Sequence, residues 1–321
     1  MRSREWNGYG GSRSPTRSVA KRALAWCVAI CAMLAVSCGG GSTSGTPTPT
    51  PSLKANYVTL VVLENVNYVD VVGSTNAPYL NSLMAQGALA TSYYANVHPS
   101  IGNYLMLTTG VIATTDDSYA GTIAPPDMAS VLTGANRSWK VYAEGIPSVG
   151  YTGGDTGTYL KRHNPFAYFT DVEGTAAANN IVPFSQLTTD AGGTLANFTM
   201  IVGNIYDVGH NCQPTVTTCT TAIRVQQADT WLKNTLPQVL SNSGFAASGL
   251  LAITFDESES DNTNGGGRVP TVLLGTKVKA AYQATGTYQH ESLLRLMLEA
   301  QGVSTLPGAS SSAPSMAEVW K

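Results

Sequence analysis

The sequence predicts an α/β fold with a mostly parallel sheet. Several apolar, β-branched runs, such as YVTLVVL at 57–63, are continuous rather than alternating, which is typical of strands buried on both faces of a parallel sheet. These runs alternate along the chain with helical patterns, as in one α/β domain. Some of them end in acidic residues, at the edge where open α/β sheets bind ligands.

The first 38 residues differ from the rest of the chain and predict an export signal. Six basic residues and one acid precede residue 23, and an apolar run follows from Ala23 to Val36. A basic segment, a short apolar segment and small residues before a cleavage site describe a signal peptide. The apolar run is too short for a comfortable transmembrane helix.

Cys38 favours a bacterial lipoprotein signal, with Cys38 as the lipidated anchor. It follows small residues and precedes GGGSTSGTPTPTPS, and residues 39–55 read as a flexible Gly/Ser/Thr/Pro linker. Ala35 stands where leucine is usual in such signals, so an ordinary cleaved signal peptide is the alternative. Either way we expect an exported protein, and any contact with the membrane would be through the Cys38 anchor.

The charge balance and the small number of cysteines after residue 38 limit the partners and the covalent cross-links that we expect. After residue 38 the chain has 12 basic and 19 acidic residues, which argues against nucleic acid as a partner, because phosphate-backbone binders need a basic face. Only Cys212 and Cys219 remain outside the signal. In an oxidising compartment such a close pair predicts one local disulfide.

The first half of the predicted domain reads as strand, helix, strand and helix. The strand from Tyr57 ends at Glu64 and Asn65, and a helix follows over 76–87, with Gly87 as its stop. A short strand over 89–94 leads to the segment 96–110. A short helix at 127–132 and the strand SWKVYAEG, which ends near Glu144, come next.

The second half continues the alternation. A helical turn is expected at 184–187, a strand at 198–202, and the best amphipathic helix at 221–240. GLLAITFDES is a buried strand that ends at Asp256 and Glu257, and RVPTVLLG is a further strand. His290 begins the last long helix.

The segment NVHPSIGNYLMLTTG, residues 96–110, is the centre of the functional prediction. Ser100 stands at the start of a helical pattern, beside backbone N–H groups that have no intrahelical partner and at the positive end of a helix dipole. Asn103, one turn later, can direct its amide at the same anion. The simpler interpretation is that Ser100 only caps the helix.

Carboxylates and histidines elsewhere favour the functional interpretation. Glu64, Asp207 and the pair Asp256–Glu257 follow strands, so their side chains can converge at one rim of the sheet. Close carboxylates repel, and a divalent cation removes that cost. Any one of these acids alone could be an ordinary surface residue. Together they predict a metal-dependent site in which Ser100 is activated to attack phosphorus.

The motifs resemble those of a known family. ENVNY, NVHPSIGNYLMLTTG, KRHNPFAYF, NIYDVGHN, ITFDES and TYQHESLLRLMLE follow one another in the order of the bacterial acid phosphatase and phospholipase C phosphoesterase family, within the alkaline-phosphatase-like superfamily. The resemblance covers roughly residues 57–303. It implies a three-layer α/β/α sandwich and assigns residues 56–321 to a phosphoesterase domain.

The resemblance also implies roles for individual residues. Ser100 matches the nucleophile, and Asn103 matches an asparagine that binds a phosphate oxygen. The metal would be held by residues from the strand ends and the serine itself: Glu64, Asn65, Ser100, Asp256 and Glu257.

Other matches leave alternatives open. Asp207 and His210 resemble a second-metal pair of nucleotide pyrophosphatases, but in the acid phosphatase branch this region and His290 would instead contact phosphate, so the number of metals is open. We expect the substrate contacts to include Asn65, Lys161, Arg162, His163 and Asn204. His98, His163 or His290 would protonate the leaving oxygen.

Taken together, the sequence predicts an exported, metal-dependent acid phosphatase that hydrolyses a small phosphorylated substrate through a phosphoserine. A phospholipase C-type phosphodiesterase is the alternative enzyme. A surface-anchored binding protein of the same fold is the alternative outside enzymes.

Overall fold

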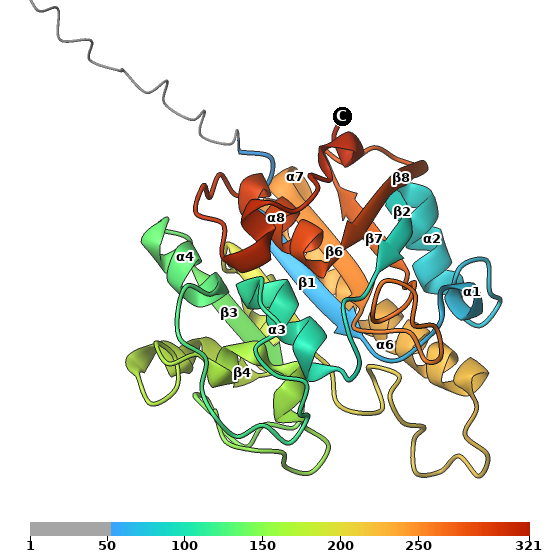
Figure 1. The fold of residues 1–321 in the computed structure, drawn as a ribbon, viewed down its shortest axis with the longest axis horizontal. Helices are drawn as coiled ribbons and strands as arrows, with labels where there is room; N and C mark the ends of the chain where they lie inside the picture. Colours follow the sequence, from blue (N-terminus) through green and yellow to red (C-terminus); the bar gives the residue numbers. More distant parts are fainter. Residues whose placement is uncertain (1–52) are drawn as a thin grey trace, which may run out of the picture. The chain divides into compact units, whose positions relative to one another are not determined.

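The computed structural model describes residues 53–321, which build one eight-stranded sheet covered by helices (Figure 1). The order of strands is β4-β3-β5-β1-β6-β7-β2-β8. The strands are β1 Tyr57–Leu63, β2 Ala88–Tyr94, β3 Trp139–Ala143, β4 Ile181–Pro183, β5 Phe198–Val202, β6 Gly249–Phe255, β7 Thr271–Gly275 and β8 Tyr282–Gln289.

The sheet is mostly parallel, as predicted. β1 lies in the middle and pairs in parallel with both β5 and β6. Only β7 runs against its neighbours, β6 and β2. In the β1–β6 pair Leu63 lies opposite Phe255, so the residues that follow these two strands, Glu64 and Asp256, emerge side by side.

Helices cover both faces of the sheet, which confirms the α/β fold. The helices are α1 Tyr68–Val71, α2 Pro78–Gln86, α3 Ile101–Thr109, α4 Met128–Gly134, α5 Gln186–Ala191, α6 Thr221–Leu240, α7 Ser243–Ser248 and α8 His290–Ala300. α3 packs on α8, and α6 packs on α2 and α1. Figure 1 shows α3 and α8 in front of the sheet and α6 behind it.

The predicted elements were found close to their expected bounds, and two strands were missed. β8 reads YQATGTYQ, with only two of its residues buried, so it lacks the apolar run that identifies a buried strand. β4 has three residues, too few for any periodic pattern. Both lie at the edges of the sheet, where less burial is required.

Some predictions concern residues outside the described range. The signal peptide over 1–38, the lipidation of Cys38 and most of the linker over 39–55 fall there. Among residues 53–321, no helix is both long and apolar enough to cross a membrane.

Candidate active site

Two neighbouring strand ends bring Glu64 and Asp256 together in the interior. The Asp256 N–H donates to the Leu63 carbonyl at 2.9 Å, and both acidic side chains are fully buried. Asn65, which follows Glu64, has a φ of 36° and donates its N–H to Asp256 Oδ1 at 3.1 Å. The positive φ turns the chain sharply at the strand end, so the backbone of Asn65 faces Asp256.

Ser100 lies against these carboxyl groups and does not cap its helix. It has helical angles, φ −45° and ψ −51°, and its side chain accepts no capping hydrogen bond. Instead Oγ donates to Glu64 Oε2 at 3.2 Å, and the carboxyl groups of Asp256 and Glu257 lie near the same hydroxyl. The capping interpretation is therefore wrong for the side chain, which is directed at the acids.

Asn103 has a different environment from the one predicted. It is fully buried, and its Oδ1 accepts the N–H groups of Asn96 and Val97 at 2.9 and 3.2 Å. Its Nδ2 donates to the Val97 carbonyl at 2.7 Å. In this arrangement the amide holds the loop that precedes Ser100.

Glu64 is held ionised by its neighbours. Burial alone would raise its pKa, but the charge and hydrogen bonding of His163, with smaller contributions from His210 and Tyr104, lower the pKa to about 2. His163 Nε2 lies 2.9 Å from Glu64 Oε1, and Tyr104 Oη donates to the same oxygen at 2.8 Å. The Tyr104 and His163 rings stack at 5.2 Å, which fixes the imidazole in place.

Asp256 and Glu257 show the opposite electrostatic behaviour. Burial, and then the nearby Glu64 charge, raise the pKa of Asp256 well above its usual range and that of Glu257 to about 8. His98 Nδ1 lies 2.7 Å from Glu257 Oε2, and its side chain is 31% exposed. A buried group of carboxyls with so little positive charge around it is unfavourable unless a cation joins it.

His290 is placed behind Asp256 as a structural residue. It is fully buried, with Nδ1 2.9 Å from Tyr93 Oη and Nε2 2.7 Å from the Asp256 carbonyl. Burial lowers its pKa to about 4. A neutral ring with both nitrogens engaged is a poor proton donor to substrate.

The residues around Ser100 fit a divalent cation if oxygen donors of different kinds are combined. Asn65 Oδ1 and Asp256 Oδ2 are buried and have no hydrogen-bond partner within the described residues. No group of three or more His, Cys, Asp or Glu side chains in residues 53–321 has a metal-binding arrangement. The predicted set of Glu64, Asn65, Ser100, Asp256 and Glu257 fits a divalent cation chemically, because carboxylate, amide and hydroxyl oxygens suit hard cations.

Asp207 and Asn204 belong to a separate cluster. Asn204 Nδ2 donates to Asp207 Oδ2 at 2.6 Å and to Glu144 Oε2 at 2.9 Å, and Trp231 Nε1 donates to Glu144 Oε1 at 3.0 Å. Burial, with the neighbouring Asp207, raises the pKa of Glu144 to about 7. We call these four residues the Glu144 cluster; its polar atoms bind one another.

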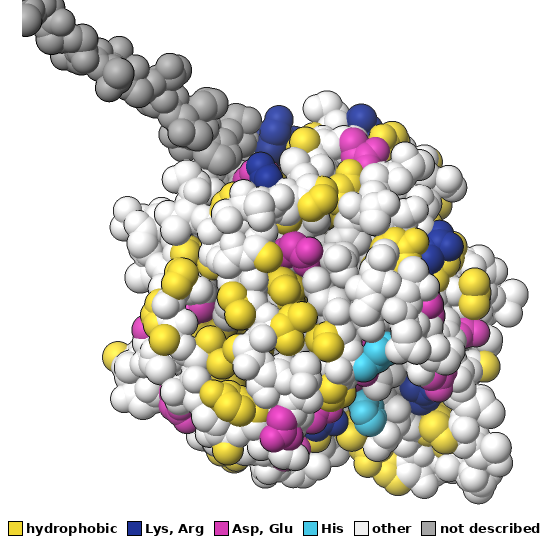
Figure 2. All heavy atoms as spheres, viewed as in Figure 1, with side chains coloured by type: hydrophobic (Ala, Val, Ile, Leu, Met, Phe, Trp, Pro, Cys, Tyr) yellow, Lys and Arg dark blue, Asp and Glu magenta, His cyan; other side chains and the backbone are white. Residues whose placement is uncertain are grey.

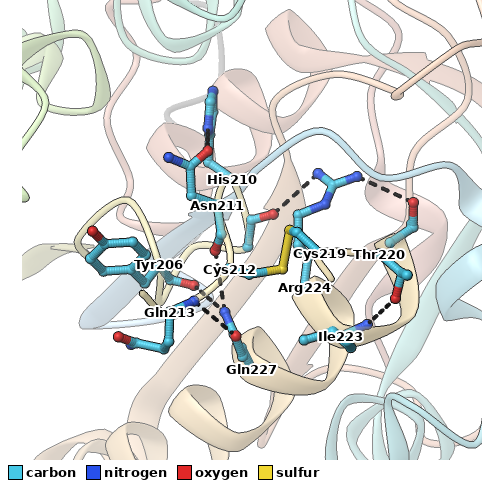
Figure 3. Close-up of a disulfide and its surroundings, with 12 residues drawn as sticks. Tyr206, His210, Asn211, Cys212, Gln213, Cys219, Thr220, Ile223, Arg224 and Gln227 are labelled. Atoms are coloured by element: carbon cyan, nitrogen blue, oxygen red, sulfur yellow. Dashed lines mark hydrogen bonds between the residues drawn. A yellow bond between two sulfur atoms is a disulfide. The ribbon is translucent and has the colours of Figure 1, made fainter. Parts of the chain in front are cut away.

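His210 lies in the same loop as Asn204 and Asp207, which follows β5. Its ring is 6.5 Å from that of His163, and its charge acts on Glu64. The predicted disulfide is present: Cys212 and Cys219 are joined, with Cα atoms 5.6 Å apart (Figure 3). The structure thus brings His210 to the Ser100 site and pairs Asp207 with Asn204.

Arg224, on α6, connects three loops that follow strands of the sheet. The sequence analysis did not predict this role. Its Nη1 donates to the carbonyls of Asn65 and Gly209, at 3.4 and 3.3 Å, and its Nη2 donates to Glu259. Figure 3 shows Arg224 beside the disulfide. The guanidinium therefore stabilises the loops that carry Asn65 and His210. Its place within an amphipathic helix gave no signal of this role.

Lys161 and Arg162 lie beside the site rather than in it. Lys161 Nζ is 3.8 Å from Glu173 Oε1, and Arg162 Nε is 3.6 Å from Asp117 Oδ2. Both line a cavity of about 630 Å³. On the face drawn in Figure 2, histidine side chains reach the surface, and acidic and basic side chains lie close to them. Of the three residues in the KRH motif, only His163 contacts Glu64.

Comparisons with known proteins identify the family and agree with this fold. A model of the Phosphoesterase family matches residues 72–304. A phosphatidylinositol-3-phosphatase of Mycobacterium tuberculosis is 28% identical over 82% of each chain. A probable acid phosphatase of Kluyveromyces lactis is 29% identical over 70% of this chain, which spans about half of that protein (54%).

Solved structures support the fold. A protein of the alkaline phosphatase superfamily from Vibrio parahaemolyticus matches with a TM-score of 0.57 and 14% identity, over 80% of this chain and 69% of that one. A putative sulfatase from Bacteroides thetaiotaomicron gives a TM-score of 0.56 at 10% identity, over 83% and 74%. The predicted alkaline-phosphatase-like architecture is confirmed.

Proposed function

The chain belongs to the phosphoesterase family and is a phosphoric ester hydrolase, and from this premise we propose that it is an exported phosphomonoesterase working through a phosphoserine at Ser100. One observation carries the proposal: the Ser100 hydroxyl, only 2% exposed as a residue, donates to the buried Glu64 carboxylate at 3.2 Å, and the carboxyl groups of Asp256 and Glu257 lie near the same hydroxyl. A serine that only capped a helix would bond the backbone.

We further propose that the site needs a divalent metal, held by Glu64, Asn65, Ser100, Asp256 and Glu257. When bound, the cation neutralises the carboxylates and polarises the phosphoryl group. The support is the pair of buried oxygens, Asn65 Oδ1 and Asp256 Oδ2, that lack a partner among residues 53–321.

Residues of the chain carry out the remaining steps of the proposed reaction. Ser100 Oγ attacks phosphorus while the bond to the leaving oxygen breaks, and water later releases phosphate from the serine. His98 or His163 protonates the leaving oxygen, since each lies at the carboxyl cluster. His290, neutral above about pH 4, holds the Asp256 backbone instead. Asn103 holds the loop before Ser100.

Monoesters are the proposed substrates, with a pH optimum on the acid side. The cavity beside the site is lined by charged, hydroxyl and glycine residues, and two tyrosines are its main apolar surface, so it offers no groove for two acyl chains. The relatives are named as phosphatases. Protonated histidines at low pH would bind the phosphate or donate to the leaving group.

Export is proposed from the basic and apolar segments before Cys38 and from the disulfide, which is typical of oxidising compartments. The Cys38 anchor is part of this proposal.

Turnover of 4-nitrophenyl phosphate and of bis(4-nitrophenyl) phosphate over pH 4–9 tests the proposal. We expect a higher kcat/KM for the monoester, with activity lost on chelation and restored by a divalent ion. A higher value for the diester would assign the chain to the phospholipase C type. Turnover of neither ester would favour the binding-protein alternative.

A further inference from the structure

The cavity of about 630 Å³ adjoins Ser100, and no role in the chemistry accounts for it. Asp117, in its wall, accepts the N–H of Ile101 at 3.1 Å, and Ile101 directly follows Ser100. Arg162, also in the wall, directly precedes His163. The cavity therefore lies next to the site at which we propose that the ester is cleaved.

The ion pairs in this wall are loose. Arg162 Nε lies 3.6 Å from Asp117 Oδ2, and its Nη1 lies 3.8 Å from Asp155 Oδ2. Lys161 Nζ lies 3.8 Å from Glu173 Oε1. All three distances exceed those of hydrogen bonds. Arg162 Nε is buried and has no hydrogen-bond partner in the described part of the chain.

Hydroxyl groups of a ligand can hydrogen-bond to both members of such a widely spaced ion pair. A hydroxyl donates one hydrogen bond and accepts others, so it can donate to a carboxylate and accept from the neighbouring guanidinium or ammonium. Several hydroxyls at fixed spacing would use several of these pairs at once. Asp155, with a side chain 55% exposed, is open to such a contact.

The tyrosines supply the complementary apolar surface. The Tyr119 and Tyr168 rings stack at 6.0 Å, and both line the cavity. Tyr119 Oη is occupied by the Thr122 carbonyl at 3.0 Å, so its ring, rather than its hydroxyl, is offered to a ligand. A sugar-like ring has hydroxyls at its edge and C–H groups on its faces, and both features find partners here.

A second phosphate on the leaving group fits poorly. The lining contains three acids, Asp117, Asp155 and Glu173, against two bases, Lys161 and Arg162. Each base already faces an acid. A further dianion would meet a negative balance, whereas a neutral ligand would not.

The geometry points to a leaving-group pocket for a neutral cyclic polyol, such as a sugar, whose phosphate is cleaved at Ser100. This inference rests on the proposed phosphomonoesterase function and names its substrate class. Asp155 and Tyr119 are the specificity-determining residues, through a carboxylate and a ring face.

Three substrates test the pocket on the whole chain: glucose 6-phosphate, propyl phosphate and glucose 1,6-bisphosphate. Glucose 6-phosphate and propyl phosphate both release a primary alkoxide, so their difference reports on the pocket. We expect kcat/KM for glucose 6-phosphate to exceed that for propyl phosphate at least tenfold, and to exceed that for the bisphosphate.

Variants assign the preference to residues. Tyr119→Ala and Asp155→Asn should each lower the ratio of kcat/KM for glucose 6-phosphate over propyl phosphate at least fivefold, and Tyr119→Phe should restore it. Asp116→Asn, an exposed neighbour that does not line the cavity, is the matched control and should leave the ratio unchanged. Melting temperatures establish that each variant is folded.

The outcomes separate the two proposals. Equal kcat/KM for glucose 6-phosphate and propyl phosphate would overturn the polyol pocket and leave the phosphomonoesterase intact. Preference for the bisphosphate would overturn it in favour of a pocket for a second anion. Hydrolysis of none of the three, together with none of 4-nitrophenyl phosphate, would overturn the proposed function itself.

Discussion

The Ser100 site and the Glu144 cluster both contain carboxyl groups that follow parallel strands, yet those of the Ser100 site are more deeply buried and the two regions differ in how their polar atoms are satisfied. Glu144 accepts hydrogen bonds from Trp231 and Asn204, and Asn204 also bonds Asp207. At the Ser100 site, Asn65 Oδ1 and Asp256 Oδ2 have no partner among residues 53–321.

This difference distinguishes a binding site from a structural cluster. A buried polar group without a partner costs about 1–3 kcal/mol, so a protein that keeps several of them together needs a compensating ligand. A cluster that satisfies itself needs none. We therefore propose that the residues around Ser100 bind a ligand and that the Glu144 cluster supports the loop that follows β5.

The largest predicted effect is that of Ser100→Ala, which removes the proposed nucleophile. Turnover of 4-nitrophenyl phosphate should fall by several orders of magnitude, on the order of 10⁴-fold or more. Stability should change little, because the Ser100 side chain makes no capping bond. Steady-state kinetics and thermal melting measure the two effects.

Ser130→Ala is the matched control, because Ser130 belongs to a real capping box with Asp127 at the start of α4. It should cost about 1 kcal/mol of stability and leave turnover near normal. Equal loss of activity in both serine variants would show that the assignment of Ser100 is wrong.

The second prediction compares the two regions directly. Asp256→Asn should lower bound metal and reduce kcat/KM by about 10²-fold or more, because it removes charge from the predicted ligand set. Asp207→Asn should leave the metal content near that of the parent chain, since Asp207 pairs with Asn204. Elemental analysis and kinetics check both; metal loss in Asp207→Asn alone would restore the second-metal hypothesis.

The disulfide should have a smaller effect. Replacing Cys212 and Cys219 with serine opens a short loop and should cost about 2 kcal/mol of stability. Because the loop follows His210, activity should fall only a few-fold and KM should rise. Chemical denaturation and kinetics measure this, and an unchanged unfolding midpoint would contradict it.

The smallest effect concerns pH. Burial raises the pKa of Glu144 to about 7 in the folded chain, above the ordinary 4.5, so the folded state binds more protons between these values. Stability should therefore rise as pH falls from above 7 toward 4.5 and level off below. Glu144→Gln, which keeps a neutral side chain, should flatten this dependence by about 1–2 kcal/mol. An unchanged slope in Glu144→Gln melts would contradict this assignment.

How much the sequence could predict differs between the fold and the site. The central strands, such as Tyr57–Leu63, were predictable because burial on both faces demands a continuous apolar run. β8 was not, because an edge strand with mostly solvent-facing residues has no such demand.

At the site, residues at strand ends and in the serine motif were predictable, since topology places them together. The partners of those residues were not. Nothing in the sequence showed that Asn204 would turn Asp207 toward Glu144, that acids would face Lys161 and Arg162, or that Asn103 would bind the preceding loop. Such contacts depend on side-chain direction in loops, which has no periodic pattern.

The most direct measurement of the central claim is the detection of a phosphoryl group on Ser100. The chain is mixed with 4-nitrophenyl phosphate, quenched rapidly in acid and digested, and the peptide that contains residues 96–110 is analysed by mass spectrometry. We expect phosphoserine at Ser100, absent from Ser100→Ala and from samples without substrate. Full turnover with no modified Ser100 at any quench time would contradict the phosphoserine mechanism.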